Sequence, residues 1–294
     1  MPTAQLHDGA AIDVTVFGDG PSVLVPVNTA VVQGPDAEQM RAWGADPNLG
    51  RTLAIGLADA GFGVIAADYE GHLAAHPKQE TLTADNVAAD LLAIADAAQA
   101  SRFAYYGYSW LALAGLQLAL RTDRISALVM GGYPPLNGPY KAMLAVTRSA
   151  HRMAVAHRDN SAPPVDVQPG DWDSVEVTSR PEQTQQYVTL YESLRDFDDR
   201  AALDQLVVVP RLVFVGANDN IVYGPKWDNA TVAIVDAIAR HSEELETHGW
   251  TVTIIPDADH MKAMQANAVL SILTPWLHNN LQDQEPTRPL RPFA

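Results

Sequence analysis

The segment from Arg102 to Leu120 reads RFAYYGYSWLALAGLQLAL, and it decides what we expect of the rest of the chain. Its aromatic first part, Phe103 to Tyr106, is typical of a buried strand, and its Ala- and Leu-rich last part, Leu111 to Leu120, is typical of a helix. Ser109 lies at the junction. A strand that becomes a helix within two residues strains the backbone at the turn and holds one side chain above a helix N-terminus. Ser109 is therefore either a candidate nucleophile or an ordinary N-cap of the helix.

The composition describes a chain that can bury a large core and that repels nucleic acid. It has 294 residues, of which 47% are hydrophobic, so one domain, with or without an insertion, is expected. Lys and Arg total 19 against 35 for Asp and Glu, and the net charge of -16 would repel phosphate backbones. The absence of cysteine excludes disulfides, thiol catalysis and thiolate metal sites.

The sequence carries no signal for a membrane or for export. The N-terminal residues lack a basic region followed by an apolar run, and no apolar stretch reaches about 18 residues. We therefore expect a cytoplasmic protein that binds a small-molecule substrate and neither nucleic acid nor membrane. The sequence leaves a homodimer open.

Short apolar strands alternate with helical patterns along most of the chain. This alternation favours an α/β fold, in which a mostly parallel sheet has helices on both faces. Thr83 is predicted to cap one of the helices, and Asp46-Pro47 is predicted to start another that ends at Gly61. The predicted buried strands are Ser22–Val27, Gly63–Ala67, Phe103–Tyr106, Ile125–Met130, Val207–Val215 and Trp250–Ile255.

The alternation stops in the middle of the chain and then resumes, which predicts an insertion. Residues 1–133 are expected to form the first part of the core domain and residues 206–281 the second part. Residues 134–205 contain proline clusters and two helix-like runs, which fit an inserted helical lid. Residues 282–294 read as a C-terminal extension. Within the second part, a single helix is predicted from about Lys226 to Thr247, and residues 28–45 are predicted to form a long loop.

Three chemically apt residues follow the ends of predicted strands. Ser109 follows one strand, Asp219 follows the strand that ends at Val215, and His260 follows the strand that ends at Ile255. Parallel sheets carry their chemistry at the carboxyl ends of the strands. A serine hydroxyl needs a base to remove its proton, and an imidazole is the best such base when a carboxylate holds its other nitrogen. Asp257 and Asp259 flank His260, but sequence neighbours in a loop rarely point the same way, so Asp219 is the favoured partner.

The residues around these positions resemble the α/β-hydrolase family over nearly the whole chain. Gly107 to Ser109 resembles the nucleophile elbow, Gly216 to Asp219 the acid loop, and Pro256 to His260 the histidine loop. Asp68 to His72 resembles the family's Asp-x-x-Gly-His turn. The resemblance implies a sheet of about eight strands, a lid after the sixth strand, and a triad of Ser109, His260 and Asp219.

Two positions depart from the family's pattern. The residue two after the serine is usually glycine and is Leu111 here, and the usual His-Gly after an early strand is replaced by Pro26-Val27-Asn28-Thr29. An oxyanion hole needs two donors aimed at the developing charge. The amide of Trp110 is predicted to supply one. The backbone of Asn28 is predicted to supply the other, with the side chain of Asn28 or Thr29 as the alternative.

Aromatic residues near the serine and in the predicted lid point to an apolar pocket with a few hydroxyl donors. We expect no cofactor and no metal, because no His or carboxylate in the lid is spaced to form a metal site. The predicted substrate-binding residues are Tyr108, Thr29, Tyr133, Tyr140, Tyr187 and Tyr191.

The sequence therefore predicts a serine hydrolase that cleaves a carboxylic ester, lactone or thioester of a small, largely apolar or aromatic substrate through an acyl-enzyme on Ser109. One alternative is a cofactor-independent lyase, cyclase or oxygenase that uses His260 and Asp219 as the base. Another is a non-catalytic ligand-binding protein. Neither the substrate nor the pathway follows from the sequence.

Overall fold

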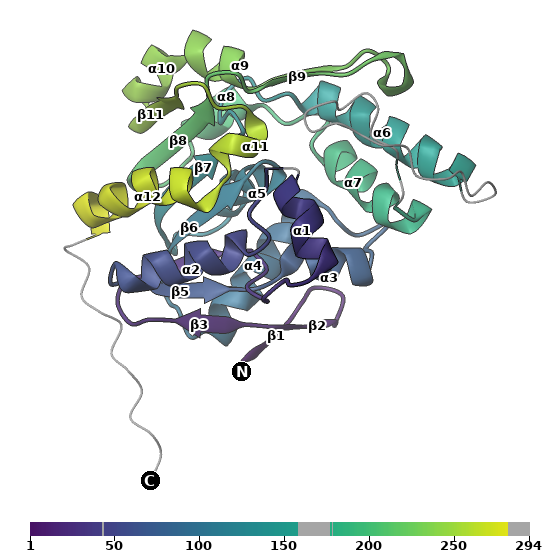
Figure 1. The fold of residues 1–294 in the computed structure, drawn as a ribbon. Helices are drawn as coiled ribbons and strands as arrows, with labels where there is room; N and C mark the ends of the chain where they lie inside the picture. Colours follow the sequence, from purple (N-terminus) through teal and green to yellow (C-terminus); the bar gives the residue numbers. More distant parts are fainter. Residues whose placement is uncertain (43, 158–176, 178, 282–294) are drawn as a thin grey trace.

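A mostly parallel β-sheet runs through the centre of the molecule, and helices cover both of its faces (Figure 1). The computed structural model describes residues 1–42, 44–157, 177 and 179–281. Among these residues the sheet has seven strands in the order β11-β8-β7-β6-β4-β5-β3, and β3 alone runs antiparallel to its neighbour. The strands are β3 (Thr15–Phe17), β4 (Ser22–Val25), β5 (Gly63–Ala66), β6 (Phe103–Tyr108), β7 (Ile125–Gly131), β8 (Arg211–Gly216) and β11 (Trp250–Ile255).

The central strands are apolar throughout because helices bury them from both sides. In β6, Ala104 and Tyr106 belong to the core on one face of the sheet, whereas Phe103 and Tyr105 belong to the core on the other face. Successive side chains point to opposite faces of a strand, so each strand needs apolar residues at every position. The α/β class predicted from the sequence is confirmed.

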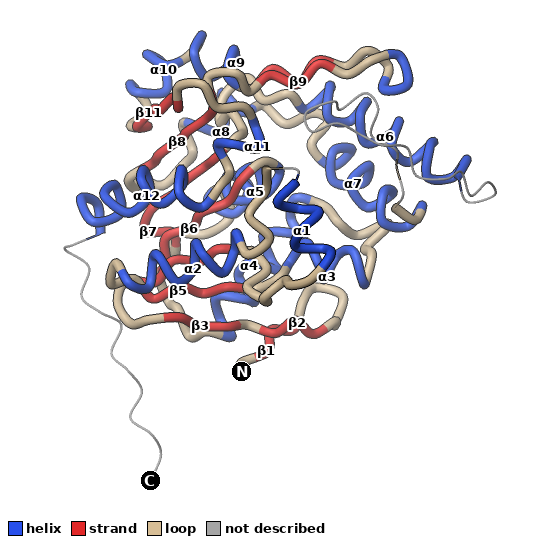
Figure 2. Tube along the Cα trace, viewed as in Figure 1, coloured by secondary structure: helices blue, strands red, loops and turns tan. Residues whose placement is uncertain are grey.

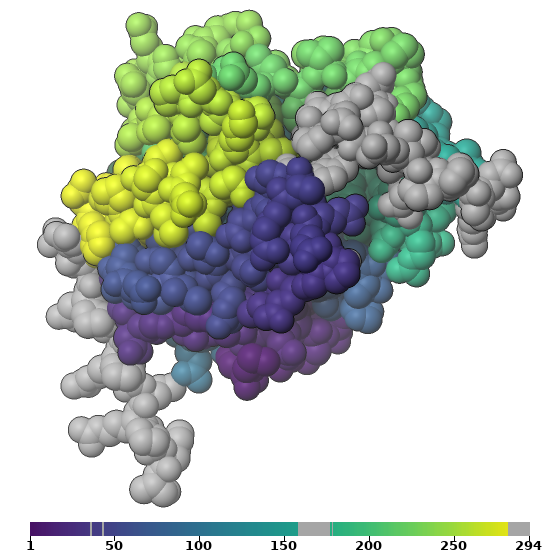
Figure 3. Space-filling view, viewed as in Figure 1, coloured from purple at the N-terminus to yellow at the C-terminus, as the bar shows by residue number. Residues whose placement is uncertain are grey.

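The two faces carry different helices. On one face, α2 (Leu49–Asp59) and α12 (Ala266–Leu281) lie side by side and bury leucines against the sheet, as the neighbouring blue and yellow surfaces in Figure 3 show. On the other face lie α4 (Ala84–Ala97) and α5 (Trp110–Ala119), whose apolar positions join the larger core cluster. Figure 2 shows these helices, in blue, around the red strands. As predicted, Thr83 caps α4, accepting a hydrogen bond from the amide of Asn86 at 3.3 Å.

Helices also fill the stretch between β7 and β8, and α6 packs against α7. These helices are α6 (Tyr140–His157), α7 (Pro181–Ser193) and α8 (Asp199–Leu203). The two helix-like runs predicted here are present, whereas the boundaries 134–205 and the role of a lid stay predictions. Part of that stretch (158–176 and 178) and the predicted extension at 282–294 lie outside the described residues. None of the described helices is long and apolar enough to cross a membrane.

The single helix predicted from Lys226 to Thr247 is correct only in its second half, which forms α9 (Val235–Arg240) and α10 (Ser242–Thr247), and is wrong in its first half. β9 and β10 pair as an antiparallel hairpin, and Asp228 and Asn229 turn the chain between them with φ angles of 59° and 52°. The cross-strand hydrogen bonds outweigh the weak helix propensity of this stretch. The segment folds as β9 (Asn220–Val222), η1 (Pro225–Trp227), β10 (Thr231–Ala233), α9 (Val235–Arg240) and α10 (Ser242–Thr247).

Other boundaries also differ from the prediction. The stretch predicted as a loop at 28–45 contains α1 (Pro35–Ala42), and α2 begins at Leu49 instead of Pro47. α3 (Tyr69–Ala75) was not predicted, although Asp68 caps it by accepting a hydrogen bond from the amide of Gly71 at 2.9 Å. The remaining elements are the hairpin of β1 (Thr3–Gln5) and β2 (Ala11–Asp13), which pairs apart from the central sheet, and α11 (His260–Ala263).

Candidate active site

Ser109 occupies a strained turn between the end of β6 and the start of α5. Its backbone has φ of 56° and ψ of -130°, a combination that a residue with a side chain adopts only at a cost. The backbone amide of Ser109 donates to the carbonyl of Gly131 at 2.8 Å, which fixes the turn against β7. Ser109 occupies the N-cap position of α5, as the alternative interpretation predicted, but its side chain makes no capping hydrogen bond to the helix.

The turn accommodates Leu111 because the close approach is made at Gly107. A β-carbon on Gly107 would lie 2.3 Å from the carbonyl oxygen of Leu111, so only glycine lets the first turn of α5 pass over the end of β6. The Leu111 side chain is buried in the core on the α4 and α5 face. Leu111 in place of the family's glycine therefore introduces no steric conflict in the turn.

Asp219 and His260 are hydrogen-bonded to each other at the ends of β8 and β11. The Nδ1 atom of His260 lies 2.9 Å from Oδ1 and 3.1 Å from Oδ2 of Asp219. The Asp219 side chain is fully buried, and the His260 side chain is 12% exposed, so only the imidazole reaches solvent. Asp259 instead caps α11 by accepting from the amide of Lys262, and Asp257 is exposed.

Backbone contacts hold the two loops that carry Asp219 and His260 in register. The amide of Asn218 donates to the carbonyl of Ala258 at 2.9 Å, and a β-carbon on Gly216 would lie 2.3 Å from the same oxygen. Tyr108 adds a side-chain brace, because its hydroxyl donates to the carbonyl of His260 at 2.8 Å. Burial raises the pKa of Tyr108 well above its usual range, so this hydroxyl remains a donor.

Ser109 and His260 lie at the same edge of the sheet, on either side of Tyr108. β6, β7, β8 and β11 are parallel, so their carboxyl ends meet at one edge, and the rings of Tyr108 and His260 have centroids 5.0 Å apart. Among the hydrogen bonds between described residues, none joins the hydroxyl of Ser109 to His260. Such bonds are often long in a free enzyme and tighten when substrate binds.

The overall fold of the chain matches solved structures of one kind. The chain is similar to the enol-lactonase from Burkholderia xenovorans LB400, with a TM-score of 0.60 and 19% identity over 94% of this chain and 99% of that chain. It is also similar to a thermophilic esterase from Thermogutta terrifontis, with a TM-score of 0.59 and 17% identity over 95% and 97% of the two chains. The chain has the α/β-hydrolase fold.

Other matches to this fold include enzymes with different chemistry. The bottromycin epimerase is similar to the chain with a TM-score of 0.53 and 14% identity over 94% of this chain and 97% of that chain. No protein-family model matches the sequence, and neither does any curated protein. The comparisons therefore establish the hydrolase fold and leave the activity to be argued from the residues.

Trp110, which follows the serine in this hydrolase fold, is held by a residue that the sequence did not single out. Its indole Nε1 donates to Oε1 of Glu70 at 2.6 Å, and its ring meets the edge of Tyr187 with centroids 5.5 Å apart. Desolvation raises the pKa of Glu70, the hydrogen bond from Trp110 opposes that rise, and the charge of Asp68 adds to it. The signal available in the sequence was the position of Glu70 directly after a strand end.

The loop after β4 carries the other predicted oxyanion donor. Asn28 is exposed and Thr29 is half-buried. The Oδ1 atom of Asn28 accepts from the amide of Ala30 at 2.8 Å, which stabilises the turn and leaves the side-chain NH₂ as a donor. The backbone amides of Trp110 and Asn28 stay the predicted oxyanion donors. The Trp110 amide, in the first turn of α5, needs no partner within the helix.

The tyrosines predicted to bind substrate divide into two environments. Tyr187 is half-buried beside Trp110. Tyr133, Tyr140 and Tyr191 are buried, with the hydroxyls of Tyr133 and Tyr191 close to each other and that of Tyr140 close to Asp199. Burial raises the pKa of each of these three hydroxyls, so they remain neutral donors. Contact of any of these tyrosines, of Tyr108 or of Thr29 with a substrate stays a prediction.

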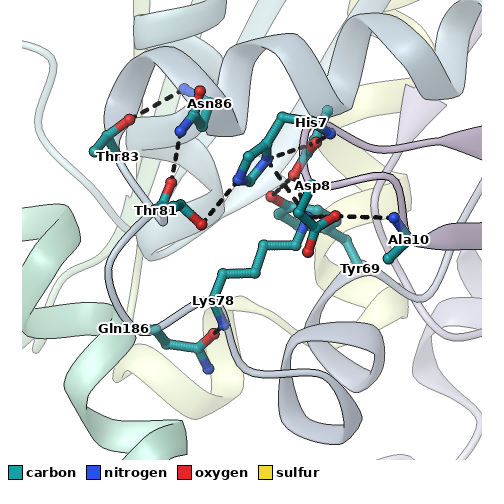
Figure 4. Close-up of polar contacts among 10 residues, drawn as sticks. His7, Asp8, Ala10, Tyr69, Lys78, Thr81, Thr83, Asn86 and Gln186 are labelled. Atoms are coloured by element: carbon teal, nitrogen blue, oxygen red, sulfur yellow. Dashed lines mark hydrogen bonds and ion pairs between the residues drawn. The ribbon is translucent and has the colours of Figure 1, made fainter.

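A second cluster of charged side chains joins the turn between β1 and β2, the loop after α3 and helix α4 (Figure 4). Lys78 is almost fully buried, and its Nζ atom lies 3.0 Å from Asp8 and 3.0 Å from Asp90. Asp90 also accepts from the Tyr69 hydroxyl at 2.7 Å and from the backbone amide of His7 at 2.7 Å. Every charge in this cluster has a partner, so its evident role is structural.

The backbone amide of Lys78 also reaches into the helical stretch between β7 and β8. It donates to Oε1 of Gln186 on α7 at 3.1 Å, which joins the charged cluster to that helix (Figure 4). Tyr69, which belongs to the cluster, directly precedes Glu70, so the cluster also fixes the start of α3. In the part of the chain that the structure describes, no group of three or more His, Cys, Asp or Glu side chains could hold a metal ion.

Proposed function

We propose that this protein is a serine hydrolase that cleaves a carboxylic ester, a lactone or a thioester through an acyl-enzyme on Ser109. The observation that carries the proposal is the hydroxyl of Ser109, which makes no capping hydrogen bond to α5 and lies in a strained turn. This turn is at the same end of the sheet as the hydrogen-bonded pair of His260 and Asp219. The fold similarity to an enol-lactonase and an esterase agrees with this chemistry.

In the proposed reaction, His260 Nε2 removes the proton of Ser109 as Oγ attacks the carbonyl carbon. The carbonyl oxygen becomes an oxyanion, which the amides of Trp110 and Asn28 stabilise by hydrogen bonds. The buried carboxylate of Asp219 holds Nδ1–H and stabilises the imidazolium. His260 then gives the proton to the leaving alcohol or thiol. Water, deprotonated by His260, attacks the acyl-enzyme and releases the acid.

The proposed substrate is small and largely apolar or aromatic. Trp110, the residue after the serine, packs edge to face with Tyr187, and the buried Tyr133, Tyr140 and Tyr191 add neutral hydroxyls from the end of β7, from α6 and from α7. Apolar walls with a few donors suit an uncharged acyl group. The helices α6 and α7 would then act as the lid over this pocket.

The test is labelling and turnover with a matched control. A fluorophosphonate probe should label the wild-type protein, and Ser109→Ala should lose both labelling and hydrolysis of a chromogenic short-chain ester while keeping its circular dichroism spectrum. Ser271→Ala, an exposed serine on α12, should change neither. Full esterase activity in Ser109→Ala would refute the proposal.

A second candidate is a non-hydrolytic enzyme of the same fold that uses His260 and Asp219 as a general base. It is favoured by the lack of the family's His-Gly pair after β4, where the chain has Asn28 and Thr29, and the bottromycin epimerase is an example of non-hydrolytic chemistry among the similar structures. The probe separates the two candidates, because only an activated serine next to a working oxyanion hole reacts with it.

A further inference from the structure

Glu70 places a carboxylate next to the proposed nucleophile. It lies in the first turn of α3, directly beyond the carboxyl end of β5, and one strand, β4, separates β5 from β6. The indole of Trp110 spans this gap with its 2.6 Å hydrogen bond to Oε1 of Glu70. Trp110 directly follows Ser109 in the chain, so its indole links the carboxylate of Glu70 to the residue next to the proposed nucleophile.

The carboxylate of Glu70 has acceptor capacity that the protein leaves unused. Trp110 bonds one oxygen, and a carboxylate can accept about four hydrogen bonds. Among the described residues, no Lys or Arg forms an ion pair with Glu70, whereas Asp68 nearby is occupied by the amide of Gly71. Glu70 is exposed, yet surrounding protein desolvates its carboxyl group and raises its pKa.

Aromatic rings lie beside this carboxylate. Trp110 and Tyr187 meet edge to face with ring centroids 5.5 Å apart, and both are half-buried, so parts of both rings remain accessible. Aromatic rings attract an ammonium group through their negative faces, and a carboxylate pairs with it directly. The net charge of -16 would further concentrate cations around the molecule.

We propose that Glu70, Trp110 and Tyr187 form a binding site for a protonated amine, and that the natural substrate carries such a group near its scissile bond. This inference rests on the proposed hydrolase function and adds the substrate class. The ammonium group would donate its N–H to the free oxygen of Glu70 and pack its methylene or methyl groups against the two rings.

The experiment compares two isosteric thioesters, S-[2-(dimethylamino)ethyl] thioacetate and S-(3-methylbutyl) thioacetate, which differ by one positive charge and one N–H donor. Because the chain has no cysteine, the released thiol can be measured with a thiol reagent without background from the protein. The readout is the ratio of kcat/KM for the cationic thioester to kcat/KM for the neutral one. A hydrogen bond to a charged group predicts that Glu70→Gln lowers this ratio about tenfold to a hundredfold.

Glu80→Gln is the matched control, because it removes the same charge from an exposed glutamate outside the proposed site. Its ratio should equal that of the wild-type protein. Glu70→Gln keeps an oxygen for the indole of Trp110, so a lowered ratio reports the lost charge. An equal ratio in Glu70→Gln and wild type, or an equal fall in both variants, would overturn the inference.

A binding measurement separates this inference from the proposed function. If the wild-type protein hydrolyses neither thioester, calorimetry with N-[2-(dimethylamino)ethyl]acetamide and N-(3-methylbutyl)acetamide replaces turnover. Tighter binding of the cationic amide that Glu70→Gln abolishes supports the amine site without hydrolysis. Equal binding of the two amides overturns it. Turnover of both thioesters with no preference for the cationic one overturns the amine site alone.

Discussion

Replacing Lys78 by methionine should destabilise the protein strongly, because it leaves a buried carboxylate without its counter-ion. The Lys78 side chain is 1% exposed and that of Asp90 is 0% exposed, and Nζ lies 3.0 Å from Oδ2. Methionine fills most of the space of the lysine stem, so the variant removes the charge and leaves little cavity. Asp90 would retain the Tyr69 hydroxyl and the backbone amide of His7 as donors, but no permanent cation.

Removing one partner of a buried ion pair costs about 3–5 kcal/mol of unfolding free energy. The remaining donors to Asp90 place the expected loss toward the lower end of that range. For a chain of 294 residues, a loss of about 3–5 kcal/mol lowers the melting temperature by about 5–8 °C. Urea unfolding followed by far-UV circular dichroism measures the free energy, and differential scanning calorimetry measures the melting temperature.

The matched control is Lys262→Met, which breaks an ion pair whose side chains are 70% and 50% exposed. It should cost less than about 1 kcal/mol. In the double variant Lys78→Met with Asp90→Asn, the carboxylate charge is also gone, so the double variant should be more stable than Lys78→Met alone. If Lys78→Met is as stable as Lys262→Met, or if the two changes at positions 78 and 90 simply add, the buried pair does not have the energetic role assigned to it.

Three other changes test the site. Asp219→Asn should lower kcat for ester turnover about 10⁴-fold, because it holds His260 in the wrong tautomer. Asp257→Asn, at an exposed position, is the control. A fall in kcat of less than tenfold in Asp219→Asn would contradict the role assigned to Asp219. Tyr108→Phe removes the hydroxyl that donates to the His260 carbonyl. We expect it to lower the free energy of unfolding by about 1 kcal/mol, measured with urea, and to lower kcat several-fold. Unchanged stability and turnover would contradict this role of Tyr108. Between pH 4 and 8, the stability of wild type relative to Glu70→Gln should fall as pH rises through the raised pKa of Glu70, because desolvation of the carboxyl group and the nearby charge of Asp68 let the folded state hold that proton to a higher pH than the unfolded state; parallel urea-unfolding curves would count against this.

Much of the fold could be predicted from the sequence, because the patterns that indicate it involve residues close together in the chain. Buried strands such as β6 need apolar side chains at every position, and Thr83 followed by an apolar period of 3.6 residues marks the start of α4. The positions of Ser109, Asp219 and His260 followed from strand ends, because parallel strands bring their carboxyl ends to one edge.

The predictions from sequence are wrong where contacts between residues far apart in the chain override the local conformational preference of a segment. The residues from Lys226 to Ala233 were predicted to start a helix, but pairing of Asn220–Val222 with Thr231–Ala233 makes them part of a hairpin. Leu111 departs from the family's glycine, and only the structure reveals that the tight contact is made at Gly107 instead. Glu70 was passed over because its importance comes from the indole of Trp110, a residue 40 positions away in the chain.

The sequence by itself determined the α/β class, the serine at a strand–helix junction, and the strand ends that carry the aspartate and the histidine, since each depends on residues adjacent in the chain. The tertiary structure alone decided which carboxylate holds His260, how Tyr108 braces that loop, and which side chains surround Trp110. Those contacts join segments tens to more than a hundred residues apart, and hydrogen-bond geometry between such segments exists only after the sheet has formed.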